Sequence, residues 1–187
     1  MTDFEFYNPV KVFFGKDQLP KISTQIPAGS KVMLIYGCGS ILKNGIYDKV
    51  KAALERFEVT EFGGIEPNPL YETSMKAVEI AKEKNIDFLL AVGGGSVIDA
   101  TKFIAAAIPF KFGDPWNILA KKMPVATAVP LGAVLTLPAT GSEMNKNSVL
   151  SRKSTDEKLA FGSPMVFPKF SFLLPDAAGT LPKRQVA

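Results

Sequence analysis

Three short apolar runs, each followed by one or more glycines, mark the first half of the chain. They cover residues 31–36, 58–62 and 87–92, and the last of them is almost wholly apolar. Short apolar runs that stop at glycine are typical of buried strands. A strand that is apolar on both sides fits a parallel sheet covered on both faces.

Helical patterns of apolar residues lie between and after these runs, at residues 41–57, 71–84 and 96–107. The second pattern has acidic Glu72 near its start and Lys82 near its end, which matches the helix dipole at both ends. Strands that alternate with helices at this spacing predict an α/β fold, with a Rossmann-like parallel sheet, flanking helices and right-handed crossovers.

The pattern changes after Pro109. Residues 111–123 predict a loop rich in polar and aromatic side chains, and residues 125–137 form an interrupted apolar stretch. Strand-like stretches follow at residues 148–151, 158–161 and 170–174. No repeat or second domain is visible, and 187 residues is a usual length for one domain, so we expect one domain over residues 1–187.

The charge and cysteine content argue against several partners. The 22 basic and 18 acidic residues give a net charge of +4, and the basic residues are scattered, so we expect no nucleic-acid partner. The single cysteine, Cys38, cannot form an internal disulfide, which is typical of a reducing cytoplasm. Residues 1–5 lack the features of a secretory signal, and no apolar run reaches the ~18 residues of a membrane helix, so we expect no membrane partner.

Histidine is absent from the sequence. With only one cysteine as well, the chain lacks the usual protein ligands of zinc, iron and copper. We therefore expect no metal site in this chain.

The strongest chemical signal is the sequence Gly93-Gly94-Gly95-Ser96, which follows the predicted strand at residues 87–92. Glycines let the backbone approach a ligand closely, and the free N–H groups at the start of the next helix attract phosphate. We expect a phosphate site here, with Ser96 as a phosphate donor or as the helix N-cap. A plain tight turn is the alternative, and the spacing is not that of the ordinary Rossmann fingerprint.

Two residues of the following helix have alternative roles. Asp99 lies three residues after Ser96, where it could cap the helix, contact a ribose or order the loop. Lys102 is interpreted as a solvated helix residue in preference to a phosphate contact.

A second glycine-rich turn, Gly37-Cys38-Gly39-Ser40, follows the predicted strand at residues 31–36. NAD-selective sites usually place an acidic side chain near this point to bind the ribose 2′-hydroxyl, and none is present. Small residues and a hydroxyl leave room for a 2′-phosphate, so NADP(H) is the expected cofactor and NAD(H) the alternative. A simple glycine-rich turn also accounts for this segment.

A third polar group follows the apolar stretch at residues 125–137. It runs from Thr136 and Leu137 to Ser142 and contains several hydroxyls that could contact a pyrophosphate or the nicotinamide ribose. A polar loop in which Ser142 caps a short turn is an equal alternative. Lys158 is either an ordinary strand lysine or a side chain that reaches into the cleft.

Together these motifs resemble the iron-dependent, group III alcohol dehydrogenases, and most closely their branch of NADPH-dependent aldehyde reductases and butanol dehydrogenases. The resemblance covers essentially the whole chain, with its motifs in the family's order. The motifs are Asn8-Pro9, Phe13-Phe14-Gly15-Lys16, Phe62 to Pro69, Gly93 to Lys102, Leu137 to Glu143 and Thr180-Leu181-Pro182.

The resemblance implies that residues 1–187 form a dinucleotide-binding domain of the dehydroquinate synthase-like type, and it assigns roles to individual residues. The pyrophosphate would be bound by Gly93, Gly94, Gly95 and Ser96, in a loop shaped by Asp99. The adenosine ribose and any 2′-phosphate would be surrounded by Gly37, Cys38, Gly39 and Ser40, with Asn68 on the adenine side. The nicotinamide side would be approached by Thr136, Leu137 and Ser142, and its ribose would be hydrogen-bonded by Lys158.

The resemblance also implies a metal site in an all-helical C-terminal domain, bound by an aspartate and three histidines, of which the first two lie on a helix that begins just beyond Ala187. We therefore expect that domain to be absent from this chain, iron or zinc to occur only in a full-length family enzyme, and the chain to be inactive alone. The implied reaction transfers a hydride between NADPH and a small aldehyde or primary alcohol, and a homo-oligomer is expected.

Two alternatives stay open. The chain could be a stand-alone nucleotide-binding module or truncated gene product without catalysis, or another enzyme of the same superfamily, such as a polyol dehydrogenase or a dehydroquinate-synthase-like lyase. The Thr-Gly-Ser-Glu and Pro-Asn-Pro loops favour the alcohol dehydrogenase over the latter.

Overall fold

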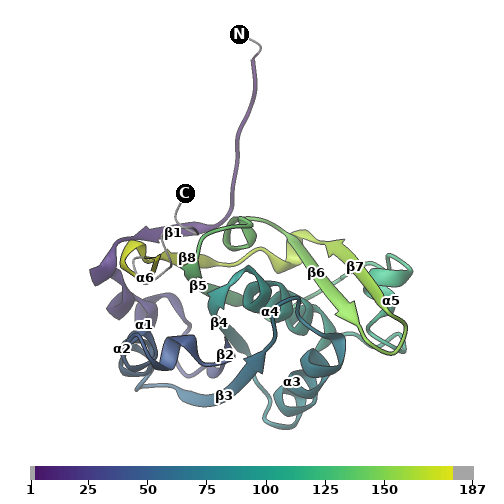
Figure 1. Ribbon diagram of the computed structural model, residues 1–187, viewed down its shortest axis with the longest axis horizontal. Coiled ribbons are helices and arrows are strands. Elements are labelled where there is room, and N and C mark those ends of the chain that lie inside the picture. The colour runs from purple at the N-terminus through teal and green to yellow at the C-terminus, as the bar shows by residue number, and fades with distance from the viewer. Residues whose placement is uncertain (1–2, 179–187) are drawn as a thin grey trace.

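The structure is a computed structural model that describes residues 3–178, without the side chains of Lys16, Ser40 and Ala178. Its centre is a sheet of six parallel strands in the order β1-β8-β5-β4-β2-β3 (Figure 1). The strands are β1 (Lys11–Phe14), β2 (Lys31–Gly37), β3 (Glu58–Ile65), β4 (Phe88–Gly94), β5 (Leu131–Leu137) and β8 (Phe170–Leu173). The predicted parallel α/β sheet is confirmed.

Helices cover both faces of this sheet. One face carries η1 (Lys16–Lys21), α1 (Ile22–Gln25), η2 (Ser40–Leu42), α2 (Ile46–Ala53) and α6 (Pro175–Ala178), and the other carries α3 (Tyr71–Glu83), α4 (Gly95–Ala107) and α5 (Asn117–Ala120). Alternate residues of β2 divide between the two cores: Val32 packs on the α2 side and Met33 on the α4 side. Successive side chains of a strand point to opposite faces, so a wholly apolar strand is what a sheet covered on both sides requires.

A separate antiparallel hairpin lies over α4, beside the main sheet (Figure 1). It consists of β6 (Asn147–Arg152) and β7 (Glu157–Gly162), and short turns η3 (Ser142–Met144) and η4 (Pro164–Val166) flank it. Buried Leu150 and Phe161 join the hairpin to the core on the α4 side of the sheet. Predicted strand-like stretches at residues 148–151 and 158–161 correspond to these two strands.

Several elements differ from the sequence prediction. The strand expected to end at Phe62 continues to Ile65, because Gly63 provides space for a neighbouring ring: a Cβ there would lie 2.5 Å from Cε2 of Tyr36. The expected helix over residues 41–57 is broken into η2 and α2, with Gly45 in the left-handed conformation at φ 73°.

Other elements were not predicted at all, among them α5 and β1. The short helix α5 lies in the segment expected to be a loop, and β1 adds an edge strand that pairs with β8. On the N-terminal side of β1, the chain extends away from the body of the protein (Figure 1). This segment exposes Phe4, Phe6 and Tyr7. Within residues 3–178, no helix has both the length and the apolar character needed to cross a membrane.

Candidate functional site

The glycine-rich loop lies where β4 ends and α4 begins. Gly94 is the N-cap of α4 with an extended backbone, and no side chain caps the helix. The helix has 13 residues, so the N–H groups of its first turn lack intrahelical partners and point back over the loop. Ser96 lies inside this first turn, and its interpretation as the N-cap is therefore wrong.

Neighbouring side chains pack tightly against this loop. A Cβ on Gly93 would lie 2.5 Å from Cγ2 of Val97, and one on Gly95 would collide with the hydroxyl of Thr140. At Gly94 the nearest atom would be Cβ of Leu137, at 3.4 Å. The missing side chains at positions 93 and 95 thus allow the loop to pack against α4 and against the segment after β5.

A cavity of about 260 Å³ opens at the N-terminus of α4. Segments far apart in the sequence contribute its lining, which consists of Asn68, Pro69, Gly95, Ser96, Asp99, Thr140, Val149, Ser151 and Lys158. Five of these were predicted site residues: Asn68, Gly95, Ser96, Asp99 and Lys158. Thr140 belongs to the group of hydroxyls that the sequence offered as pyrophosphate or ribose contacts, whereas Pro69, Val149 and Ser151 had no site role in the sequence analysis. The register of the hairpin could have revealed Ser151, which pairs with Lys158 on the same face.

Asn68 connects three parts of this cavity. Its backbone is left-handed, at φ 55°, a conformation that asparagine tolerates better than most residues. Its N–H donates to Oγ of Ser96 at 3.3 Å, and its Oδ1 accepts a hydrogen bond from Nζ of Lys158 at 2.8 Å. The resemblance assigned Asn68 to the adenine side and Lys158 to the nicotinamide ribose, but the structure brings the two side chains together at one point of the cavity.

Asp99 connects α4 to the hairpin. Its Oδ2 accepts a hydrogen bond from the N–H of Val149 at 3.1 Å, and its carbonyl oxygen accepts one from the Ser148 hydroxyl at 2.8 Å. Burial raises the pKa of the Asp99 carboxyl, while the Val149 amide and the charge of Lys102 oppose the rise. No side chain caps α4, so the capping role of Asp99 is wrong. Its hydrogen bonds reach the hairpin and not the glycine-rich loop, and its roles in ordering that loop and in contacting a ribose stay predictions.

Lys102 is not the solvated helix residue expected from the sequence. Its side chain is fully buried, at 0% exposure, and Nζ donates to the carbonyl oxygens of Asn145 and Asn147, both at 2.8 Å. A third bond reaches Oδ1 of Asn145 at 3.0 Å. Burial lowers the pKa of Lys102 to about 8, and the nearby carboxylates of Asp99 and Glu143 limit the decrease. The expectation failed because the hairpin, which is distant in sequence, covers this face of α4.

The segment after β5 faces the glycine-rich loop. Leu137 is 38% exposed, beside Gly94, and Thr136 is half-buried at the end of β5. Ser142 is only 4% exposed, and its hydroxyl shares a 2.8 Å hydrogen bond with the hydroxyl of Thr140. Thr140 therefore lines the cavity, while the buried Ser142 holds its hydroxyl by a hydrogen bond.

The turn after β2 lies at the same carboxyl edge of the sheet, since β2 and β4 are parallel neighbours. Cys38 is exposed, and its thiol donates to the carbonyl oxygen of Ile65 at 3.6 Å. Gly39 adopts φ +102°, which L side chains rarely allow. The predicted role of the Ser40 hydroxyl lies outside the described part of the chain, and the assignment of this turn to a ribose 2′-phosphate stays a prediction.

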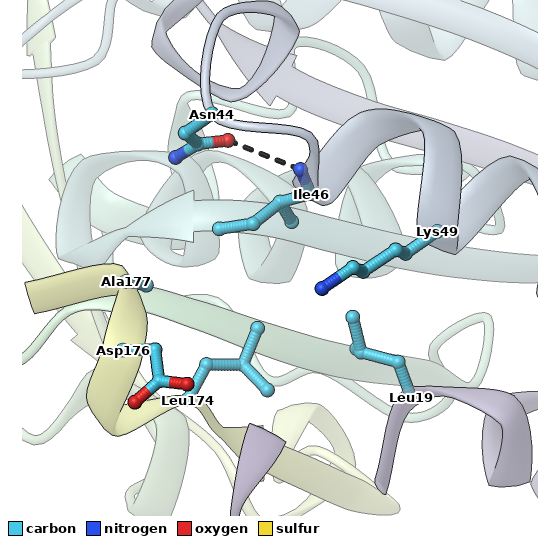
Figure 2. Close-up of a pocket in the computed structure, with 7 residues that line it drawn as sticks. All are labelled: Leu19, Asn44, Ile46, Lys49, Leu174, Asp176 and Ala177. Carbon is cyan, nitrogen blue, oxygen red and sulfur yellow. Dashed lines mark hydrogen bonds between the residues drawn. The ribbon is translucent and has the colours of Figure 1, made fainter. Parts of the chain in front are cut away.

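A second cavity lies on the other face of the sheet, between α2 and α6 (Figure 2). Its volume is about 90 Å³, and its lining combines Leu19, Asn44, Ile46, Lys49, Leu174, Asp176 and Ala177. None of the predicted site residues lines it. The cavity at the N-terminus of α4 is therefore the better candidate site.

Metal ligands do not gather anywhere in the described chain. Among residues 3–178, no group of three or more histidine, cysteine, aspartate or glutamate side chains could hold a metal ion.

Comparison with known proteins gives a consistent match. Residues 9–175 match the iron-containing alcohol dehydrogenase family. The chain is 50% identical over 189 residues to the NADPH-dependent aldehyde reductase YqhD of Escherichia coli, covering 100% of this chain and 49% of YqhD. It is 50% identical over 186 residues to the probable NADH-dependent butanol dehydrogenase 1 of Bacillus subtilis, covering 98% of this chain and 48% of that protein.

Solved structures agree with these matches. The crystal structure of Escherichia coli YqhD superposes with a TM-score of 0.94 at 50% identity, covering 98% of this chain and 48% of that structure. The NADH-dependent butanol dehydrogenase A of Thermotoga maritima superposes with a TM-score of 0.93 at 41% identity, covering 99% of this chain and 47% of that structure. The chain thus spans about half the length of the relatives it matches.

Proposed function

Because this chain belongs to the iron-containing alcohol dehydrogenase family, we propose that it is the NADP(H)-binding half of an alcohol dehydrogenase or aldehyde reductase. The observation that carries the proposal is the cavity at the N-terminus of α4, where the glycine-rich loop meets Asn68, Thr140 and Lys158. A helix N-terminus beside glycines is a favourable site for a pyrophosphate.

Each side of this cavity would bind a different part of the nucleotide. The free N–H groups of the first turn of α4 bind the pyrophosphate, and the hydroxyls of Ser96 and Thr140 donate hydrogen bonds to it. Lys158, oriented by Asn68, donates to ribose hydroxyls and adds a positive charge beside the phosphates. When bound, the nicotinamide supplies the hydride that reduces an aldehyde or accepts one from a primary alcohol.

The preference for NADP(H) rests on the turn after β2. Residues 37–47 contain no aspartate or glutamate, so no carboxylate from this segment repels a 2′-phosphate or selects the 2′-hydroxyl of NAD(H). The relatives are named for both cofactors: NADPH for YqhD and NADH for the Bacillus subtilis protein. NAD(H) therefore remains the alternative cofactor.

The iron or zinc implied by the family does not fit the described residues, which bring no three metal ligands together. No step of the reaction is therefore assigned to a metal held by residues 3–178. We propose that substrate activation depends on groups outside this part of the protein, and that the substrate is a small aldehyde or alcohol, as the names of the relatives suggest.

Titration calorimetry tests the cofactor assignment. We expect the 187-residue chain to bind NADPH more tightly than NADH, because only the former places its additional phosphate at the turn after β2. Tighter binding of NADH would contradict the NADP(H) preference, and binding of neither would contradict the nucleotide site itself. An NADPH-oxidation assay with butyraldehyde then distinguishes a catalytic chain from one that only binds nucleotide.

We also propose that the protein is a homo-oligomer located in the cytoplasm. The exposed aromatic side chains of Phe4, Phe6 and Tyr7 support self-association, since clusters of exposed apolar residues commonly mark interaction surfaces. The cytoplasmic location rests only on the single cysteine, Cys38, and stays a prediction.

A further inference from the structure

A buried lysine connects the helix of the phosphate site to the loop that faces it. Lys102 lies on α4, and its ammonium group donates all three of its hydrogens to acceptors in residues 145–147. No carboxylate lies within ion-pair distance of it among the salt bridges of residues 3–178. A fully buried charge is retained in a fold only when such hydrogen bonds compensate its lost hydration.

Asn145 links Lys102 to the loop that borders the cavity. Its Oδ1 accepts hydrogen bonds from Lys102 and from the N–H of Asn147, at 3.0 and 2.8 Å. Its Nδ2 donates to the carbonyl oxygen of Gly141 at 2.9 Å. The amide thus faces the ammonium group with its oxygen and the loop with its nitrogen, so the orientation of Asn145 depends on Lys102.

The loop held in this way is the one that meets the glycines of the phosphate site. Gly141 is left-handed, at φ 68°, and lies between Thr140 and Ser142, whose hydroxyls are hydrogen-bonded to each other. Thr140 packs directly against Gly95 at the start of α4. A shift of the Gly141 carbonyl would therefore move Thr140 relative to the first turn of the helix.

We propose that Lys102 is a positioning residue that holds the loop of residues 140–142 over the N-terminus of α4 and thereby sets the affinity for the diphosphate part of the nucleotide. The inference rests on the proposed nucleotide site and adds to it a residue that does not touch the ligand. Its action is indirect, through Asn145 and Gly141.

Protonation of Lys102 is part of this arrangement. The charged groups that face it are the carboxylates of Asp99, on α4, and Glu143, on η3. Because burial lowers the pKa of Lys102 to about 8, the ammonium group loses one of its three donated hydrogens as the pH rises through that value. Nucleotide affinity should decrease over the same interval.

The test compares NADPH with adenosine 2′-monophosphate, which lacks the diphosphate, in calorimetric titrations of the 187-residue chain. Lys102→Met should weaken NADPH binding about tenfold, as expected for loss of buried charged hydrogen bonds, and leave adenosine 2′-monophosphate binding nearly unchanged. Asn145→Ala should do the same while it leaves the two backbone acceptors of Lys102 in place, so it decides the question if Lys102→Met does not fold. Lys76→Met, at an exposed lysine of α3, is the matched control and should bind both ligands as the wild type does.

The pH dependence gives a second readout. Wild-type affinity for NADPH should decrease as the pH rises through 8, and the affinity of Lys102→Met should stay constant. Equal weakening of both ligands would mean that Lys102 only stabilises the fold, and unchanged NADPH binding in both variants would also overturn the inference. Binding of neither NADPH nor NADH by the wild-type chain would instead contradict the proposed nucleotide site.

Discussion

Arg152 lies over the ring of Tyr71, with its guanidinium carbon 4.8 Å from the ring centroid. The same guanidinium group reaches Oδ2 of Asp114 at 3.1 Å and stands 5.6 Å from the ring centroid of Trp116. Since Arg152 ends β6 and Tyr71 begins α3, this contact attaches the tip of the hairpin to the body of the protein. The hairpin carries Lys158, so the attachment also affects the cavity at the N-terminus of α4, where we propose that the nucleotide binds.

Arg152→Ala should reduce the free energy of unfolding by about 1–2 kcal/mol, because it removes a partly exposed ion pair and the contacts with two aromatic rings. Urea unfolding followed by the fluorescence of Trp116, the single tryptophan, measures the change. Lys153→Ala, at the exposed neighbouring position, is the control and should leave the stability unchanged. Equal stability of the two variants would show that the aromatic contacts of Arg152 contribute little.

Lys158→Ala should weaken NADPH binding about tenfold without a loss of stability, because the lysine is exposed and its side chain makes one hydrogen bond within residues 3–178, to Oδ1 of Asn68. Lys146→Ala, at another exposed lysine, serves as the control in the same calorimetric titrations. Wild-type affinity in Lys158→Ala would remove this side chain from the proposed site.

Substitutions at two adjacent glycines should differ in effect. Gly95→Ala places a methyl group against the hydroxyl of Thr140, so we expect a loss of about 1–3 kcal/mol of stability together with weaker NADPH binding. Gly94→Ala would meet Leu137 no closer than 3.4 Å, which is an ordinary contact, and its backbone conformation is open to any residue, so its stability should change little. Thermal unfolding and titration of both variants check this order, and the reverse order would contradict the packing of Thr140 against the loop.

The fluorescence of Trp116 should report the titration of Glu157. The indole N–H donates to Oε2 of Glu157 at 3.1 Å, and hydrogen bonds from Thr155 and Trp116 hold the pKa of this carboxyl below its ordinary value of 4.5. A lowered pKa means that the interaction is complete above the ordinary value and is lost as the pH falls through the lower one. An acid titration of the emission should thus have its midpoint below pH 4.5 in the wild type and no such transition in Glu157→Gln.

Replacement of Phe4, Phe6 and Tyr7 by serine should shift the protein toward the monomer, because these side chains are 79–89% exposed and would be covered by the neighbouring subunit of the proposed homo-oligomer. Size-exclusion chromatography with light scattering measures the mass. Leu42→Ser, an exposed apolar residue in η2, is the control and should leave the mass unchanged. A wild-type protein that is already monomeric would contradict the proposed homo-oligomer.

Neighbouring residues alone were sufficient to predict the glycine-rich loop and its helix. The apolar run before Gly93 and the helical pattern after Ser96 lie next to each other in the chain, so local rules apply to them directly. The same rules misjudged Gly63, since a glycine at the end of an apolar run has the same local sequence whether it stops the strand or makes space for Tyr36. Only the packing of β3 against β2 distinguishes these cases.

The sequence by itself thus determined the alternation of strands and helices over residues 31–107, the parallel sheet and the place of the glycine-rich loop, because apolar periodicity and glycine positions are local properties of the chain. The tertiary structure decided which side chains meet: it buried Lys102 under the hairpin, joined Asn68 to Lys158 across 90 residues of sequence, and placed Thr140 against Gly95. Such contacts depend on how the hairpin packs against α4, and no pattern within either segment encodes the distance between them.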